Sequence, residues 1–204
     1  MSIDTLYPQA LQLLQQLIAT PSFSKQEAAT AILIEQWLQQ NHIQTKRVGN
    51  NVYAINQHFD AAKPSILLNS HHDTVKPNGG YTLDPFQPLI KEGKIYGLGS
   101  NDAGGCLVSL MACFVHFYSK ENLPYNIVLL ASAEEEISGT GGVELALADE
   151  TFLQITHQHF KQSAAKENCF AIVGEPTLMQ MAVAERGLMV VDAVAIGKAG
   201  HAAR

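Results

Sequence analysis

The sequence has few cysteines, and their spacing suggests neither a disulfide framework nor a structural zinc site. Cys106, Cys113 and Cys169 are the only three in 204 residues, and they form no Cys-x-x-Cys pair. An odd count without such pairs fits a reducing compartment. Cys106 and Cys113 are seven residues apart in a helical pattern, so we expect both to be small core residues.

Long hydrophobic segments are also absent. No apolar run approaches the roughly 20 residues that span a bilayer, and the longest candidate is Ile127 to Ala131. The N-terminal segment carries Asp4 and repeated glutamine, where a signal peptide needs a basic region and an unbroken apolar core. We therefore expect a cytoplasmic protein that has no membrane partner.

Basic residues are too few and too scattered for a nucleic-acid-binding surface. Thirteen Lys and Arg stand against nineteen Asp and Glu, which gives a formal net charge of −6 without any basic block. Nucleic acid is therefore not an expected partner. Hydrophobic residues make up 47% of the chain. This is enough to build the core of one medium domain, or of one domain and the beginning of another.

Apolar periodicity predicts several helices. Leu6, Ala10, Leu13 and Leu17 repeat at helical spacing, and Pro21 ends this first helix. A second helix is predicted up to Asn41, with Ser24 to Glu27 as a capping box at its start. Two more are predicted, one from about Asp102 and one over Gly142 to Ala148.

Unbroken apolar runs predict three strands that are buried on both faces: Ser65 to Ser70, Asn126 to Ala133 and Phe170 to Gly174. Two shorter strands, Gln44 to Arg47 and Asn51 to Asn56, are expected to pair antiparallel. Strands that alternate with helices indicate an α/β fold. We predict a mixed, mainly parallel sheet flanked by helices.

The character of the sequence changes near Gln180. Met181 to Ile196 is rich in β-forming residues and is broken only by Arg186 and Gly187. We interpret residues 1–179 as one α/β domain and residues 180–204 as the beginning of a second domain.

Acidic and imidazole side chains follow each of the three predicted buried strands. His71 and Asp73 follow the first, Glu134 to Glu136 the second and Glu175 the third. Ligands of open α/β sheets bind outside the carboxyl ends of the strands. Because carboxylates and imidazole together bind hard and borderline cations, this pattern predicts a metal-dependent hydrolase. Each cluster taken alone also fits a solvated charge run or a surface residue at a strand end.

The first cluster has a defined polarity. In an extended segment His71 and Asp73 point to the same side, whereas His72 points away. We predict that His71 is a metal ligand and that the Asp73 carboxylate fixes the orientation of its ring.

Asp102 lies in the glycine-rich segment from Gly97 to Gly105. A nucleotide-binding loop is a weak interpretation, because Asp stands where that motif has its last Gly and a carboxylate would repel a phosphate. Asp102 fits a helix N-cap without any further role. It also fits a metal ligand, because the glycines around it would allow close backbone approach. The sequence leaves both interpretations open.

Four ordered motifs together resemble the acetylornithine deacetylase and succinyl-diaminopimelate desuccinylase family, and the likeness runs from Leu14 to Arg204. The resemblance implies a two-metal amidohydrolase, usually with zinc, for which cobalt or manganese can substitute. It also implies a zinc-peptidase-like (phosphorylase/hydrolase-like) α/β domain and a β-α lid that forms a homodimer. The motifs are His71-x-Asp73, Gly-x-Gly-x-x-Asp ending at Asp102, an acidic triplet followed by Ile137, and Gly174-Glu175-Pro176-Thr177.

The resemblance also implies a role for each site residue. His71 and Glu175 would hold one metal ion, Asp102 would bridge the two ions, and Glu136 would hold the other. Glu135 would be the general base. Two further features belong to the family pattern: His201 as the lid histidine that steadies the oxyanion, and a cis peptide bond between Asp102 and Ala103.

The implied reaction is removal of the acyl group from a small N-acyl amino acid, as in acetylornithine deacetylase-like members that serve arginine biosynthesis. Two metal ions would activate a water, and Glu135 would pass its proton to the leaving amine. Two alternatives stay open. One is a dinuclear zinc aminopeptidase or dipeptidase of the same superfamily, and the other is a relative that binds without catalysis.

The sequence departs from the family pattern at three places. Glu134 stands where the triplet usually begins with Asp, and the common Gly-Arg-Gly-x-x-Asp-Met-Lys lacks its Arg, Met and Lys here. Family members continue well past the position of Arg204 and supply a last metal-binding His. We therefore expect both domains to be incomplete, the second metal to lack one ligand, and this chain on its own to be inactive.

Overall fold

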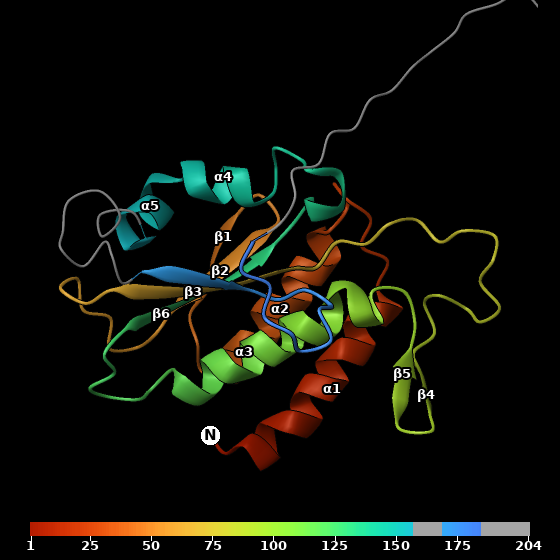
Figure 1. The fold of residues 1–204 in the computed structure, drawn as a ribbon, viewed down its shortest axis with the longest axis horizontal. Helices are drawn as coiled ribbons and strands as arrows, with labels where there is room; N and C mark the ends of the chain where they lie inside the picture. The colour runs from red at the N-terminus through yellow and green to blue at the C-terminus, as the bar shows by residue number, and fades with distance from the viewer. Residues whose placement is uncertain (157–168, 185–204) are drawn as a thin grey trace, which may run out of the picture.

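A five-stranded mixed sheet lies between two layers of helices (Figure 1). The computed structural model describes residues 1–156 and 169–184. The strand order is β1-β2-β6-β3-β7, in which β3 pairs in parallel with both β6 and β7, and β2 pairs antiparallel with both β1 and β6. The predicted α/β fold is therefore confirmed. The strands are β1 (Lys46–Val48), β2 (Asn51–Ile55), β3 (Ser65–His71), β6 (Asn126–Ser132) and β7 (Phe170–Val173).

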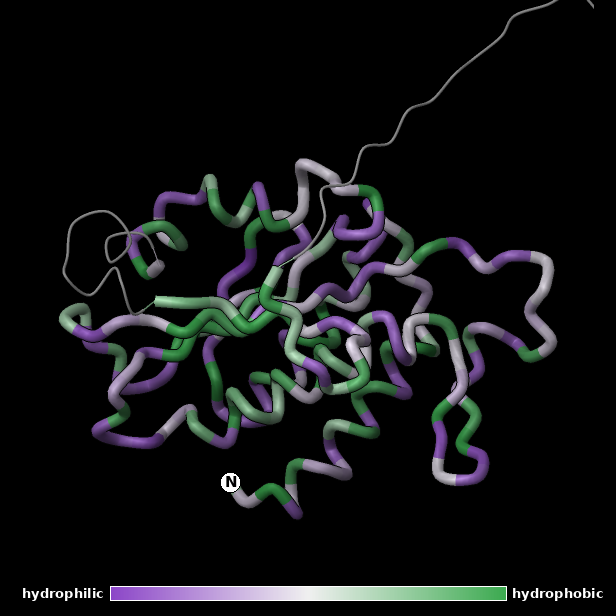
Figure 2. Tube along the Cα trace, in the orientation of Figure 1, coloured by the Kyte–Doolittle hydropathy of each residue, from purple (hydrophilic) through white to green (hydrophobic). Residues whose placement is uncertain are grey.

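Helices cover both faces of the sheet, as the unbroken apolar runs require. On β6, Leu129 packs with the core under α1, α2 and α3, whereas its neighbours Val128 and Leu130 pack with the core under α4 and α5. All seven residues of β6 are buried as a result, and the central strands are coloured mainly as hydrophobic in Figure 2. The helices are α1 (Ile3–Ala19), α2 (Ala28–Gln40), α3 (Gly105–Phe117), α4 (Val143–Ala148) and α5 (Glu150–Thr156).

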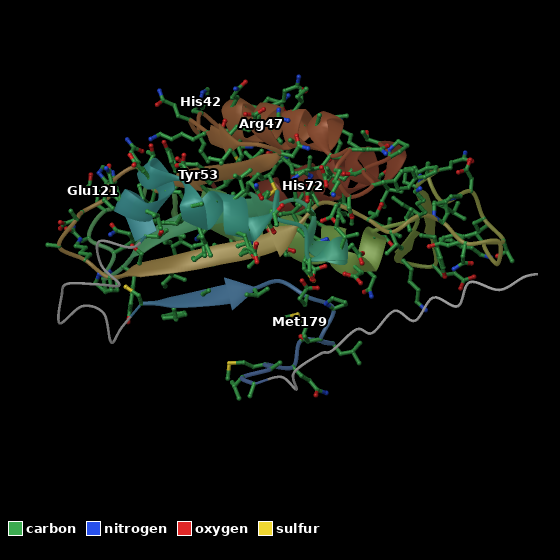
Figure 3. All side chains as sticks on the ribbon, turned by 90° about the horizontal axis from the view of Figure 1, so that it is seen from above. His42, Arg47, Tyr53, His72, Glu121 and Met179 are labelled. Carbon is green, nitrogen blue, oxygen red and sulfur yellow. The ribbon has the colours of Figure 1, made fainter. Side chains whose placement is uncertain are left out.

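The edge strand β7 differs from the other parallel strands. All four of its residues, Phe170–Val173, are exposed. Figure 3 shows β7 at the outer edge of the sheet, with Met179 beyond it. The sequence predicted that Phe170 to Gly174 forms a strand buried on both faces. The strand is present, but its predicted burial is wrong, because apolar residues alone do not show whether a strand lies inside the sheet or at its edge.

Some short elements, among them two strands and a helix, were not predicted from the sequence. A separate hairpin is formed by β4 (Leu89–Lys91) and β5 (Lys94–Tyr96), and α5 follows α4 directly.

None of the helices in residues 1–156 and 169–184 is long and apolar enough to cross a membrane.

The predicted capping box at the start of α2 is wrong. The N-cap residue of α2 is Glu27, which makes no side-chain capping bond. The Ser24 hydroxyl instead donates to Asp73 Oδ2 at 2.7 Å, and the Glu27 carboxylate accepts from Asn50 Nδ2 at 2.7 Å. Both side chains have partners from distant segments, which replace the local bonds of a capping box.

The prediction for the two cysteines near α3 is also wrong. Cys113 is exposed on α3 and Cys106 is half-buried, so they are not both core residues.

The predicted β-rich second domain falls almost entirely on residues 185–204, which lie outside the described residues. Its beginning, residues 181–184, has no regular secondary structure, and the division into two domains stays a prediction.

Candidate metal centre

Three strand ends bring the predicted site residues together. In the parallel pairs, His71 of β3 lies opposite Ser132 of β6, and Asn69 lies opposite Val173 of β7. The acidic triplet Glu134 to Glu136 therefore begins two residues beyond the partner of His71, and Glu175 begins two residues beyond β7. Parallel strands place their carboxyl ends at one edge, so residues far apart in the sequence meet there.

Asp102 reaches the same place from the segment that precedes α3. This segment is an irregular helical turn, Ser100–Gly104, in which Asp102 itself has an extended backbone conformation. The Asp102–Ala103 peptide bond is cis, as the resemblance predicted. A Cβ on Gly104 would lie against the backbone oxygen of Gly99 and 2.9 Å from Leu14 Cδ1. Glycine is therefore required where this turn packs on α1.

His71 is the centre of the cluster. Its ring is buried, and Nε2 lies 3.1 Å from Asp102 Oδ1, 3.7 Å from Glu135 Oε2 and 3.9 Å from Glu175 Oε1. The carboxylates of Asp102 and Glu135 are more than half exposed. One buried nitrogen thus faces three carboxylates that solvent and small ligands can reach.

Asp73 supports this arrangement from behind. The His71 Nδ1 lies 3.0 Å from the backbone oxygen of Asp73 and 3.4 Å from its Oδ1, so the ring faces Asp73 through its second nitrogen. The Asp73 carboxylate also accepts the backbone N–H groups of Glu135 at 3.1 Å and Glu136 at 3.2 Å, and the Ser24 hydroxyl. Burial raises the pKa of Asp73, but these donors outweigh burial and hold the pKa below its usual value.

The electrostatics of the cluster favour a positive charge at Nε2. Burial alone would lower the pKa of His71, but the hydrogen bond and charge of Asp73, with the charges of Glu135 and Glu175, raise it to about 9. The pKa values of Glu136 and Glu175 are raised, first by burial and then by the neighbouring carboxylates, although the charge of His71 acts in the opposite direction. A cation at this place would relieve the repulsion between the carboxylates.

The donor set fits a metal ion. His71, Asp102 and Glu175 each offer one donor atom, and these atoms all lie within 4.8 Å of one another. Zinc binds nitrogen and oxygen ligands at about 2.0–2.2 Å, so donor atoms around one ion lie a few ångströms apart, as they do here. One imidazole with carboxylates is a donor set for zinc, manganese or another divalent cation.

Glu136 lies in the same electrostatic field, since the charges of Asp102 and His71 act on its carboxyl group. Among the described residues, Asp102 and Glu136 are therefore the candidate ligands for a second ion. This pair would need further donors to complete a coordination shell.

Glu134, the residue that departs from the family pattern, points into its own loop. Its Oε2 accepts the backbone N–H of Gly141 at 3.2 Å, and its backbone oxygen accepts that of Gly139 at 2.9 Å. A Cβ at either glycine would collide with the Glu134 side chain. The loop thus accommodates the longer acidic side chain because it has glycine at both positions.

Some predicted residues do not join the cluster, and some members were not predicted. His72 points away from it as expected, with Nδ1 2.9 Å from Thr30 Oγ1 and Nε2 3.0 Å from the Asn50 backbone oxygen. His201 lies outside the described residues. Ser24 and Glu27 contact the cluster but were assigned to a helix cap. No spacing in the sequence indicates their distant partners.

Comparison with known proteins agrees with this geometry. Residues 67–190 match peptidase family M20/M25/M40. The chain is 30% identical to acetylornithine deacetylase of Proteus mirabilis over 206 residues, which cover 95% of this chain and 49% of that protein. The chain therefore spans about half the length of this curated relative.

Two solved structures have a similar fold. Human carnosine dipeptidase 1 matches with a TM-score of 0.60 and 19% identity, over 74% of this chain and 37% of that one. An M20 family metallo-carboxypeptidase from Sulfolobus solfataricus matches with a TM-score of 0.55 and 25% identity, over 63% of this chain and 31% of that one. With the family match over residues 67–190, these findings show that the chain belongs to peptidase family M20/M25/M40.

Proposed function

We propose that this protein is a metal-dependent amidohydrolase that removes the acyl group from an N-acyl amino acid. The observation that carries the proposal is the meeting of His71, Asp102 and Glu175 at one edge of the sheet, with the Glu135 carboxylate beside them. The 30% identity to an acetylornithine deacetylase supports an N-acyl amino acid as the substrate class, and N-acetylornithine as the first candidate.

In this proposal His71 and Glu175 would hold one ion, and Asp102 and Glu136 would hold the second. Bound ions of this kind polarise a carbonyl group and lower the pKa of a water. Zinc is the first choice, and cobalt or manganese are possible substitutes. The homodimer through a second domain, the oxyanion role of His201 and a cytoplasmic location belong to the same proposal.

The protein's own residues would move the proton. Glu135 lies at the exposed side of the cluster, 3.7 Å from His71 Nε2. Its carboxylate can accept a proton from the attacking water and return it to the nitrogen of the leaving amine. Asp73 would keep the His71 ring oriented through Nδ1, and it would hold the backbone of Glu135 and Glu136 in place.

Peptide hydrolysis is the second candidate. The similarity to a metallo-carboxypeptidase at 25% identity favours it, because that enzyme class also cleaves an amide bond with a metal ion. The same cluster would serve either substrate, so substrate comparison has to separate the two.

The test combines metal titration with hydrolysis. Zinc binding is measured by calorimetry for the wild type and for His71→Ala, and hydrolysis of N-acetylornithine and of a dipeptide is measured over a range of protein concentrations. The proposal expects zinc binding that depends on His71, and deacetylation that Glu135→Gln abolishes while zinc is retained. A specific activity, measured per molecule of protein, that rises with protein concentration would mean that catalysis depends on association of two copies.

Other outcomes contradict parts of the proposal. Faster cleavage of the dipeptide would favour a peptidase. Zinc binding without any turnover at high concentration would make this chain a non-catalytic metal-binding protein.

A further inference from the structure

Glu27 is a buried carboxylate that accepts three hydrogen bonds. None of its surface is exposed. Its Oε1 accepts the backbone N–H groups of Lys25 at 2.5 Å and Glu134 at 3.3 Å, and its Oε2 accepts Asn50 Nδ2 at 2.7 Å. Burial of a carboxylate is costly unless donors surround it. Here the donors come from three separate segments.

The acidic triplet is held by two carboxylates from outside it. The N–H of Glu134 points to Glu27, whereas the N–H groups of Glu135 and Glu136 point to the two oxygens of Asp73. These three N–H groups precede or begin the short 3-10 turn Glu135–Ile137. They have no partner within such a turn. Two buried carboxylates therefore take three consecutive donors of the catalytic loop.

The first of the three bonds is at the point where the chain turns. Glu134 has a positive φ of 51° and joins β6 to the turn that carries Glu135 and Glu136. A non-glycine residue in this conformation is uncommon. The direction in which the next two side chains leave the backbone depends on this residue, and Glu27 holds its N–H.

Asn50 links Glu27 to the strand that carries His71. The Asn50 side chain donates to Glu27 and accepts from Arg47 Nη2 at 2.9 Å, while its backbone oxygen accepts Nε2–H of His72 at 3.0 Å. Glu27, Asn50 and His72 thus form a continuous path from the triplet to the residue beside His71.

We propose that Glu27 is a positioning residue that sets the direction of Glu135 and Glu136 relative to His71. The proposal rests on the proposed function, in which Glu135 is the base and Glu136 a ligand. Glu27 does not touch substrate or metal, and it acts through the backbone of Glu134.

Glu27→Gln is the direct test, because it keeps the size of the side chain and replaces one acceptor by a donor. Wherever the new amide group lies, it faces a donor: either Asn50 Nδ2 or the N–H groups of Lys25 and Glu134. Glu35→Gln is the matched control, since Glu35 lies on α2, the helix that begins after Glu27, and its carboxylate pairs with Arg47 at 3.4 Å.

The double variant Glu27→Gln/Asn50→Asp is the rescue. The carboxylate at position 50 can accept from the amide at position 27, and it can still accept from Arg47. The hydrogen-bond pattern is restored with its polarity reversed, and no contact of Glu135 or Glu136 is changed directly.

The first measurement is amide hydrogen exchange of Glu134 to Glu136 in protein treated with a chelator, which depends neither on metal nor on hydrolysis. The second is cobalt affinity, followed by visible absorption. Glu27→Gln should speed exchange at Glu134 by about tenfold, because a hydrogen bond to a charged acceptor is lost. It should also weaken cobalt binding by about 10- to 100-fold, as changes of ligand-supporting residues do.

The double variant should recover both properties, and Glu35→Gln should change neither. The proposal is overturned if Glu27→Gln lowers only the unfolding temperature and leaves exchange and cobalt affinity as in the wild type. It is also overturned if the single variant does not fold and the double variant folds without recovering cobalt binding. Failure of wild-type turnover would count against the proposed function alone, since exchange at Glu134 is measured without it.

Discussion

The site is built from two unlike halves: an enclosed half at the ends of the inner strands β3 and β6, and an open half at the end of the exposed edge strand β7. Asp73, beyond β3, is buried, and its carboxylate accepts the Ser24 hydroxyl and two backbone N–H groups. Glu175, beyond β7, follows a strand whose four residues are all exposed, and about a third of its own side chain is exposed. Both acidic residues were predicted by the same rule, from their place after a buried apolar run.

This difference in burial predicts which substitutions lower folding stability and which weaken only ligand binding. A buried residue of the enclosed half, such as Asp73, is tied to the fold by its hydrogen bonds, so its loss should affect both properties. A residue at the open half reaches the cluster without a similar network, and its loss should affect ligand binding alone. Paired substitutions at the two halves test this distinction.

The largest contrast is expected between Asp73→Ala and Glu175→Ala. Asp73→Ala leaves the buried His71 ring and two backbone N–H groups without their carboxylate, and should reduce the free energy of unfolding by about 3–5 kcal/mol. Glu175→Ala should change it by no more than about 0.5 kcal/mol. Both variants should lose zinc affinity. Urea unfolding and calorimetry measure the two properties, and equal destabilisation by both variants would refute the division into two halves.

Substitution of two valines tests the same contrast in stability with apolar side chains alone. Val128 in β6 is fully buried and Val173 in β7 is more than half exposed. Val128→Ala should cost about 1.5–3 kcal/mol of stability, whereas Val173→Ala should stay within about 0.5 kcal/mol. Thermal unfolding of the two variants checks this. A large loss in Val173→Ala would mean that β7 is covered in solution.

Substitution of two glycines tests how far the neighbouring atoms in each half can move to accept a Cβ. A Cβ on Gly142 would collide with the backbone oxygen of Ala133, which cannot turn aside. A Cβ on Gly174 would lie 2.9 Å from Leu110 Cδ1, the end of a side chain that can rotate away, and 3.1 and 3.2 Å from the Cβ atoms of Cys106 and Ser70. Gly142→Ala should therefore destabilise by about 1–3 kcal/mol and Gly174→Ala by no more than about 1 kcal/mol. Denaturant unfolding gives both values, and the reverse order would contradict the comparison.

The smallest effect is expected for Ser24→Ala, which removes one hydrogen bond to Asp73. The loss should be about 1 kcal/mol. Ser109→Ala is the control, because the Ser109 hydroxyl only bonds the preceding turn of its own helix at an exposed position, and its change should stay within about 0.5 kcal/mol. If the two serines are equivalent in thermal unfolding, Ser24 is not part of the enclosed network.

Much of this molecule could be predicted from the order of its residues. The apolar run from Asn126 to Ala133 indicated a strand with helices on both faces, and β6 is buried along its whole length. The placement of His71 and Glu175 after such strands indicated that they would meet. These predictions succeed because the period of an element and the edge at which a strand ends are local properties.

The predictions failed where a side chain chose between a local and a distant partner. Ser24 and Glu27 fit a capping box, yet they bond Asp73, Asn50 and Glu134. A capping pattern cannot show that another segment offers a stronger acceptor or donor. Cys113 was misassigned for a different reason: a spacing of seven along a helix shows that two residues share a face, but not which face the sheet covers, and Cys113 lies on the exposed side of α3.

The sequence by itself determined the alternation of helices and strands, the parallel centre of the sheet and the gathering of imidazole and carboxylate groups at its carboxyl edge. The supporting role of Asp73 was predicted from its spacing to His71, but only the tertiary structure decided that Glu27 is a buried support and that Asp102 and Glu135 face outward. Periodicity and strand order follow from backbone geometry along the chain. The burial and partners of a carboxylate depend on residues that folding brings from elsewhere.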